Sequence, residues 1–170
     1  MNNNDILRRL RFAFNWNDDS VIDLFRLGDK VVTRTEISNW LKKDEDEAFE
    51  SIIDKNLAAL LNGFIIHKRG RREGAEVVNE KTLINNLVLK KLKIALSLTD
   101  EDIVEILELS KFNVSKHEIN AFFRAPTQSQ YRLCKDQILR NFLMGLQIKY
   151  TNVRPTAEKD KPTNIFDKYK

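Results

Sequence analysis

One internal repeat constrains the fold of this 170-residue chain more than any other feature of its sequence. After a shift of 82 positions, residues 3–11 (NNDILRRLR) align with residues 85–93 (NNLVLKKLK) without a gap. The same shift aligns residues 32–37 (VTRTEI) with residues 114–119 (VSKHEI). One constant offset, kept over roughly 65 residues, is the signature of tandem copies of one structural unit. We therefore predict two copies of one small domain.

Hydrophobic residues recur at the 3.6-residue period of an α-helix in four segments of each copy. The chain has only five Gly and three Pro, which favours helices over a fold rich in turns. The predicted helices begin near Asn4, Asp18, Thr33 and Asp54 in the first copy and near Asn86, Thr99, Ser115 and Asp136 in the second. We expect Asn4 and Asn86 to be N-caps. Residues 33–36 (TRTE) and 115–118 (SKHE) each fit a capping box. The sequence thus predicts an all-α fold of two tandem four-helix units.

One glycine falls inside the last predicted helix of each copy, at the equivalent positions Gly63 and Gly145. A glycine inside a helix costs about 1 kcal/mol relative to alanine. Because this cost recurs in both copies, we expect another helix to approach the backbone closely there. One candidate for that approach is a contact between the two units.

The predicted boundaries follow from where the helical pattern stops. They are a first repeat at 1–68, a basic polar linker at 69–83, a second repeat at 84–150 and a disordered tail at 151–170. The first residues lack the basic and apolar regions of a signal peptide, and no apolar run reaches membrane-span length. The single cysteine is typical of a reducing compartment. We predict a cytoplasmic protein with no membrane partner.

Catalytic and metal-binding motifs are missing from the sequence. His67, His117 and Cys134 are the only soft metal ligands, and they do not have the spacing of a metal site. An acidic run at 44–47 aligns with the uncharged residues 126–129, as expected of a solvated loop. We therefore predict no cofactor and no enzymatic activity. The alternative is an enzyme with an unfamiliar site in a polar pocket.

Basic residues are more informative, because positive charge recurs at equivalent positions while the residue type changes. The pairs are Arg8 with Lys90, Arg11 with Lys93, Arg34 with Lys116, and Lys42 with Arg124. Contacts to phosphate tolerate such exchanges better than bidentate contacts to bases do. Besides these positions on the first and third predicted helices, residues 68–72 form a further basic patch. The alternative is a solvated surface on which Lys and Arg stems cover the edge of the core.

The second and third predicted helices resemble a helix-turn-helix of the phage-repressor type, through residues 32–42 (VTRTEISNWLK). In that motif the second helix enters the major groove of DNA. The resemblance implies that Arg34, Thr35, Ser38 and Asn39 face DNA in the first copy, and Lys116, His117 and Asn120 in the second. The turn before residue 34 is several residues longer than in that family, and Trp40 is replaced by Phe122 in the second copy.

Residues 1–150 resemble the YehS-like family of small bacterial proteins of unknown function. The resemblance rests on residues 3–11, 37–43 (ISNWLKK), 58–63 (AALLNG), 68–74 (KRGRREG), 92–96 (LKIAL) and 115–118 (SKHE). It implies a bacterial cytoplasmic protein with a duplicated domain, and it implies no activity. Our prediction from the residues is DNA or RNA binding through the basic ends of the first and third helices. The alternative is a protein-interaction module that uses exposed apolar residues such as Phe12 and Phe166.

Overall fold

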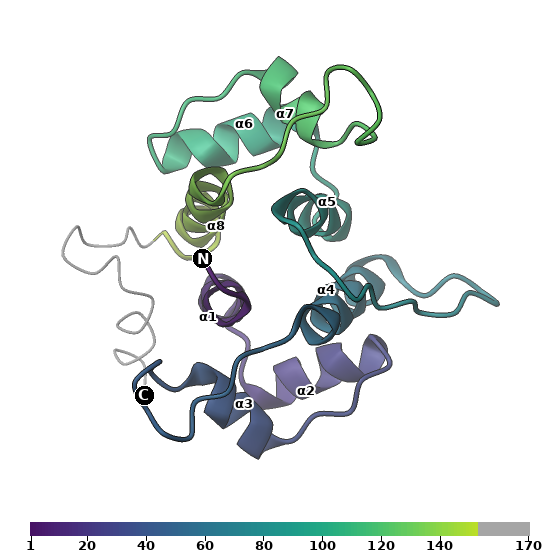
Figure 1. Cartoon of the computed structure of the whole chain (residues 1–170), viewed down its shortest axis with the longest axis vertical. Coiled ribbons are helices and arrows are strands. Elements are labelled where there is room, and N and C mark those ends of the chain that lie inside the picture. The colour runs from purple at the N-terminus through teal and green to yellow at the C-terminus, as the bar shows by residue number, and fades with distance from the viewer. Residues whose placement is uncertain (153–170) are drawn as a thin grey trace.

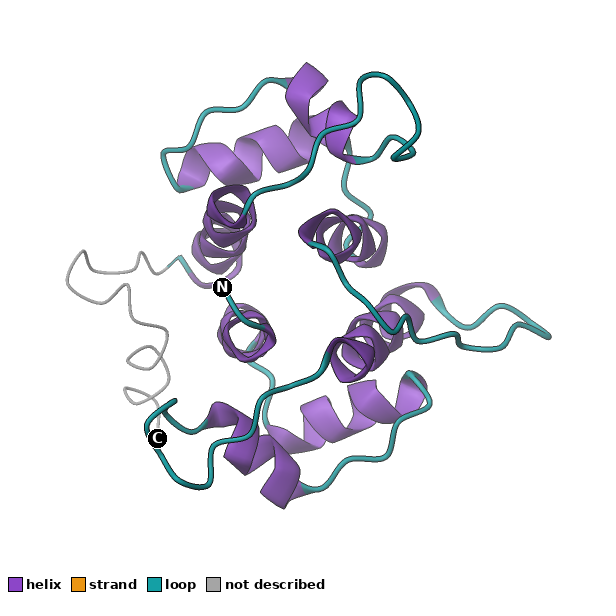
Figure 2. Ribbon diagram, in the orientation of Figure 1, coloured by secondary structure: helices purple, strands orange, loops and turns teal. Residues whose placement is uncertain are grey.

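The computed structural model describes residues 1–152, and every regular element within them is a helix (Figure 2). The first repeat contains α1 (Asn3–Phe14), α2 (Asp18–Leu27), α3 (Arg34–Leu41) and α4 (Asp54–Arg69). The second repeat contains α5 (Asn85–Ala95), α6 (Asp100–Leu109), α7 (Lys116–Phe122) and α8 (Asp136–Thr151). The prediction of an all-α fold built from two tandem four-helix units is confirmed. Most of the predicted tail, including Phe166, lies outside the described residues.

The two repeats pack through their first and last helices (Figure 1). Helix α1 lies against α8, and α5 lies against α4. Because α1 is equivalent to α5 and α4 to α8, these are two instances of one contact, as at the interface of a twofold-symmetric dimer. Each first helix packs more extensively on the last helix of the other repeat than on that of its own. The α2–α3 and α6–α7 pairs lie outside this central group, at opposite ends of the long axis (Figure 1).

A continuous hydrophobic core joins both repeats. Trp40 and its counterpart Phe122 are each 4% exposed, which agrees with their expected role as core aromatics. At the junction of α1, α4 and α8, the Phe14 ring lies 5.2 Å from the ring of Phe64 and 4.8 Å from that of Tyr150. Aromatic packing therefore crosses from one repeat to the other.

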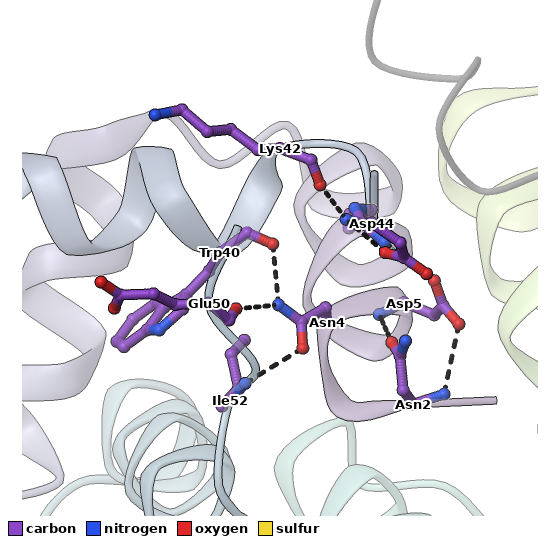
Figure 3. Close-up of polar contacts among 9 residues, drawn as sticks. Asn2, Asn4, Asp5, Trp40, Lys42, Asp44, Glu50 and Ile52 are labelled. Atoms are coloured by element: carbon purple, nitrogen blue, oxygen red, sulfur yellow. Dashed lines mark hydrogen bonds and ion pairs between the residues drawn. The ribbon is translucent and has the colours of Figure 1, made fainter. Parts of the chain in front are cut away.

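A buried asparagine near the start of the first helix organises each repeat. Asn4 Nδ2 donates to the carbonyl oxygens of Trp40 and Glu50, each at 2.8 Å, and Asn4 Oδ1 accepts from the Ile52 amide at 3.0 Å (Figure 3). The side chain of Asn4 therefore fixes both the end of α3 and the irregular segment that follows it.

The second repeat reproduces this arrangement with Asn86, which bonds to the Phe122 carbonyl at 3.1 Å, the Arg132 carbonyl at 2.7 Å and the Cys134 amide at 2.8 Å. The expectation that Asn4 and Asn86 are N-caps is wrong. Helix α1 is capped by Asn2, in a capping box with Asp5 (Figure 3), whereas α5 starts after Ile84 without a side-chain cap.

The two mid-helix glycines mark close crossings, as expected, but the crossings lie within each repeat. A Cβ on Gly63 would stand 1.7 Å from the Leu24 carbonyl oxygen on α2, and one on Gly145 would stand 2.0 Å from that of Ile106 on α6. The candidate contact between the units at this point is therefore wrong. These crossings attach the outer helices to the central group.

The start of α7 agrees with the predicted capping box, whereas the start of α3 shows only the half that Thr33 supplies. The Thr33 side chain accepts a hydrogen bond from the Glu36 amide at 3.1 Å. Ser115 and Glu118 form the full reciprocal capping box. Both caps fix where the outward faces of α3 and α7 begin.

Candidate nucleic-acid interface

The outward faces of α3 and α7 carry the exposed part of the predicted site. Each helix is anchored by a fully buried isoleucine, Ile37 in α3 and Ile119 in α7. The side chains on the opposite side of these helices face solvent. The exposed predicted residues are Arg34, Thr35 and Ser38 on α3 and Lys116, His117 and Asn120 on α7.

Both exposed cations form an ion pair with the helix before them. Arg34 pairs with Asp19, and Lys116 pairs with Glu101 at the equivalent position. The hydrogen bond from Lys116 lowers the pKa of the Glu101 carboxyl, and the same bond raises the pKa of the Lys116 ammonium. Arg34 is 61% exposed and Asp19 is 69% exposed. Exposed pairs of this kind contribute little to stability and exchange readily with other charges.

Arg11 and Lys93 lie deeper and connect the first helix of each repeat to the second. Arg11 Nη1 lies 2.6 Å from Asp18 Oδ1, and Lys93 Nζ lies 2.7 Å from Asp100 Oδ1. Burial alone would raise the pKa of Asp100, but hydrogen bonds from Lys93 and Asn120 hold it below its ordinary value. The recurring charge at these positions is therefore matched by a recurring carboxylate, and it has a structural use in both repeats.

Arg8 and Lys90 are equivalent in sequence but differ in placement. Arg8 is 2% exposed and donates to Asp5 Oδ1 at 2.9 Å and to the Lys42 carbonyl at 2.6 Å. Leu87 stands at the position equivalent to Asp5, and Lys90 is exposed. Of this predicted pair, only Lys90 lies at the surface.

The remaining predicted residues lie at the C-terminal ends of α3 and α7. Lys42 Nζ donates to Asn39 Oδ1 at 2.9 Å, and both side chains are half-buried. Arg124 is also half-buried, and its Nε has no hydrogen-bond partner within residues 1–152.

Sequence reasoning missed one relationship among the basic residues. The α4–α5 contact brings Arg69, at the end of the first repeat, beside Lys90 and Lys93 of the second. The basic patch at 68–72 is evident in the sequence, but its position relative to α5 depends on how the repeats pack. Comparing equivalent positions of the two repeats does not predict that Arg69 lies beside Lys90 and Lys93.

The described part of the chain gives little support for metal binding, for a cysteine nucleophile or for an apolar docking surface at Phe12. Residues 1–152 contain no group of three or more His, Cys, Asp or Glu residues arranged to hold a metal ion. Cys134 is buried, and this burial raises the pKa of its thiol to about 12, which disfavours a nucleophilic thiolate at neutral pH. Over the same residues, every helix is too short or too polar to span a bilayer. Phe12, the described candidate for an apolar docking surface, is half-buried.

Comparison with known proteins agrees with the repeat seen in the sequence and in the structure. The profile of a family described as "Protein of unknown function (DUF1456)" matches twice, over residues 3–70 and 85–151. The chain is also 43% identical over 147 residues to the uncharacterized protein YehS of Escherichia coli (strain K12), covering 86% of this chain and 94% of that protein. No solved structure matches. The chain therefore belongs to the DUF1456 family, whose matched segment occurs here twice in tandem.

Proposed function

We propose that this protein is a non-enzymatic, cytoplasmic module that binds nucleic acid through the exposed faces of α3 and α7. The observation that carries the proposal is the recurrence of one exposed surface at positions related by the approximate twofold symmetry. Arg34 and Thr35 begin this surface on α3, and Lys116 and His117 begin it on α7. Paired helices related by a twofold axis are the usual means by which dimeric helix-turn-helix proteins contact two half-sites.

The electrostatics of these faces fit an exchange of partners upon binding. In the free protein, Asp19 forms an ion pair with Arg34, and Glu101 forms one with Lys116. A nucleic-acid phosphate can replace either carboxylate at small cost, because both ion pairs are solvated. Arg8 takes no part in this proposal, because its guanidinium is buried in contacts within the first repeat.

The sharpest test changes each ion pair from both sides. Arg34→Ala with Lys116→Ala removes the cations and should weaken binding to a short DNA duplex, measured by fluorescence anisotropy. Asp19→Asn with Glu101→Gln removes the closer carboxylate from each cation and should strengthen binding, with Arg34 still 3.8 Å from Asp18 Oδ2. The matched control is Glu73→Gln with Glu76→Gln, because it gives the same change in net charge on exposed linker residues.

A salt series adds a second, quantitative readout. The logarithm of the association constant should fall with the logarithm of salt concentration by about 0.9 for each phosphate contacted on duplex DNA. The cation-deficient double variant should show a slope shallower by up to two contacts. Absence of binding at low salt to both duplex DNA and RNA would overturn the proposal. Equal strengthening by the linker control would attribute the effect to net charge and overturn the assignment to α3 and α7.

A further inference from the structure

A hollow of about 310 Å³ lies where the end of α4 meets the second repeat. We call it the basic hollow. Its lining residues are Arg69, Lys90, Lys93, Ile94, Ser97, Leu98 and Phe123. Arg69 comes from the first repeat and the other residues come from the second. Arg69 Nη1 donates to Ser97 Oγ at 2.9 Å, so the contact between the repeats also fixes this side chain at the rim.

The charge of the basic hollow is positive and largely uncompensated. Within the described part of the chain, Arg69 and Lys90 have no carboxylate partner. Lys93 shares its charge with Asp100 and lies over the Phe123 ring, with its Nζ 4.3 Å from the ring centroid. Two held cations and one exposed lysine therefore surround the same small volume, an arrangement that favours an anion.

Comparison of the two repeats indicates that an exposed cation at the position of Lys90 is particular to the second repeat. The residue equivalent to Lys90 is Arg8, which Asp5 and the Lys42 carbonyl hold in the interior. Leu87 replaces Asp5 in the second repeat, so no carboxylate at this position draws Lys90 inward. The structural use that explains the cation in the first repeat therefore does not explain it in the second.

Part of the lining of the basic hollow is apolar. Ile94 is one of the few large hydrophobic residues of the described chain that remain exposed, at 37%, and Leu98 lies beside it. A volume of about 310 Å³ is at the lower end of the range of about 300–1,000 Å³ that is usual for small-molecule sites. A ligand that fits must combine an anionic group with a compact flat or apolar group.

We propose that the basic hollow binds a nucleotide, with the phosphate between Arg69 and Lys90 and the base against Ile94 and Leu98. The inference rests on the proposed function for its choice of ligand class, and it assigns that ligand to a site separate from α3 and α7. The shared chemistry is a phosphate and a base linked through a sugar. Its source is either a free mononucleotide or an unpaired nucleotide of a nucleic-acid strand.

The test uses amide NMR spectra of the full chain titrated with AMP, adenosine and inorganic phosphate. AMP should shift the amides of Lys90, Ile94 and Ser97 in a saturable manner and bind more tightly than either of its parts. Lys90→Ala and Arg69→Ala should each weaken AMP binding about tenfold, through loss of one charge-assisted contact. Lys55→Ala is the matched control, because Lys55 is exposed at the opposite end of α4.

Failure of this inference is distinguishable from failure of the proposed function. Arg34→Ala with Lys116→Ala should leave the AMP titration unchanged, because those residues lie outside the basic hollow. A 5′-phosphorylated single-stranded oligonucleotide that displaces AMP would identify a strand as the source, and AMP binding without such displacement would identify a free nucleotide. Unmoved amides around the hollow, or equal AMP binding by wild type and Lys90→Ala, would overturn the proposal.

Discussion

The amide side chains of Asn4 and Asn86 supply hydrogen bonds that two irregular segments cannot make by themselves. Residues 42–53 and 124–135 contain no regular helix, so their backbone groups need partners from elsewhere. Each asparagine satisfies two carbonyls and one amide, using both its donor and its acceptor. An aspartate cannot replace it, because a carboxylate has no N–H to donate.

Asn86→Ala should therefore destabilise the protein strongly, although it removes only a small side chain. We expect a loss of about 2–4 kcal/mol in the free energy of unfolding, because buried backbone groups lose their partners. Urea denaturation followed by circular dichroism measures this change. Asn113→Ala, in an exposed loop position, is the control and should change stability little. Equal stability of the two variants would show that water replaces the lost hydrogen bonds.

Residue roles were the hardest part to predict from sequence. The recurrence of Asn4 and Asn86 indicated importance, but an asparagine at a helix start is equally typical of a cap, and only the fold of residues 42–53 distinguishes the two. Similarly, Arg8 and Lys90 share charge and position in the repeat. Their different placement depends on Asp5 in one repeat and Leu87 in the other. Only the structure shows that Arg8 turns inward toward that carboxylate.

At the scale of elements, the crossing of the second and fourth helices is the most extensive helix contact within each repeat. Gly63 lets the backbone of α2 approach α4, and Gly28 faces the Ala59 carbonyl oxygen at the same crossing. Helix limits and the need for a close approach at Gly63 were predictable from the sequence. Which helix approaches was not, because a glycine reports missing side-chain volume and does not identify the neighbour.

Gly63→Ala should force these two helices apart, because a Cβ there would lie 1.7 Å from the Leu24 carbonyl oxygen. We expect a loss of about 3 kcal/mol or more, at the upper end of overpacking effects. Thermal unfolding monitored by circular dichroism gives the measurement. Gly74→Ala is the control: its φ is +72°, but the space around it is open, so only backbone strain of about 1–2 kcal/mol applies. A Gly63→Ala variant as stable as wild type would contradict the observed helix crossing.

At the scale of the whole molecule, the chain resembles a symmetric dimer whose two subunits have been joined by a linker. Hydrogen bonds at the ends of the helices recur in both repeats, as the helix contacts do. Asp54 Oδ2 accepts from the Leu83 amide at 2.9 Å, and Asp136 Oδ2 accepts from the Met1 nitrogen at 3.1 Å, which is the equivalent contact. The duplication was evident from the sequence. The packing of each first helix on the last helix of the other repeat was not, because a sequence repeat does not specify which surfaces meet.

This arrangement predicts that the linker is dispensable for association. A protease site introduced at Gly74, which is exposed and meets no neighbouring atoms, should allow cleavage between the repeats. The two fragments should then elute together in size-exclusion chromatography, because α1–α8 and α4–α5 hold them together. The cleaved protein should lose about 1.4 kcal/mol of stability for each tenfold dilution, whereas the intact chain should lose none. Fragments that separate and remain folded would show that each repeat is an independent domain, and the twofold interface described above would then be incidental to the stability of the fold.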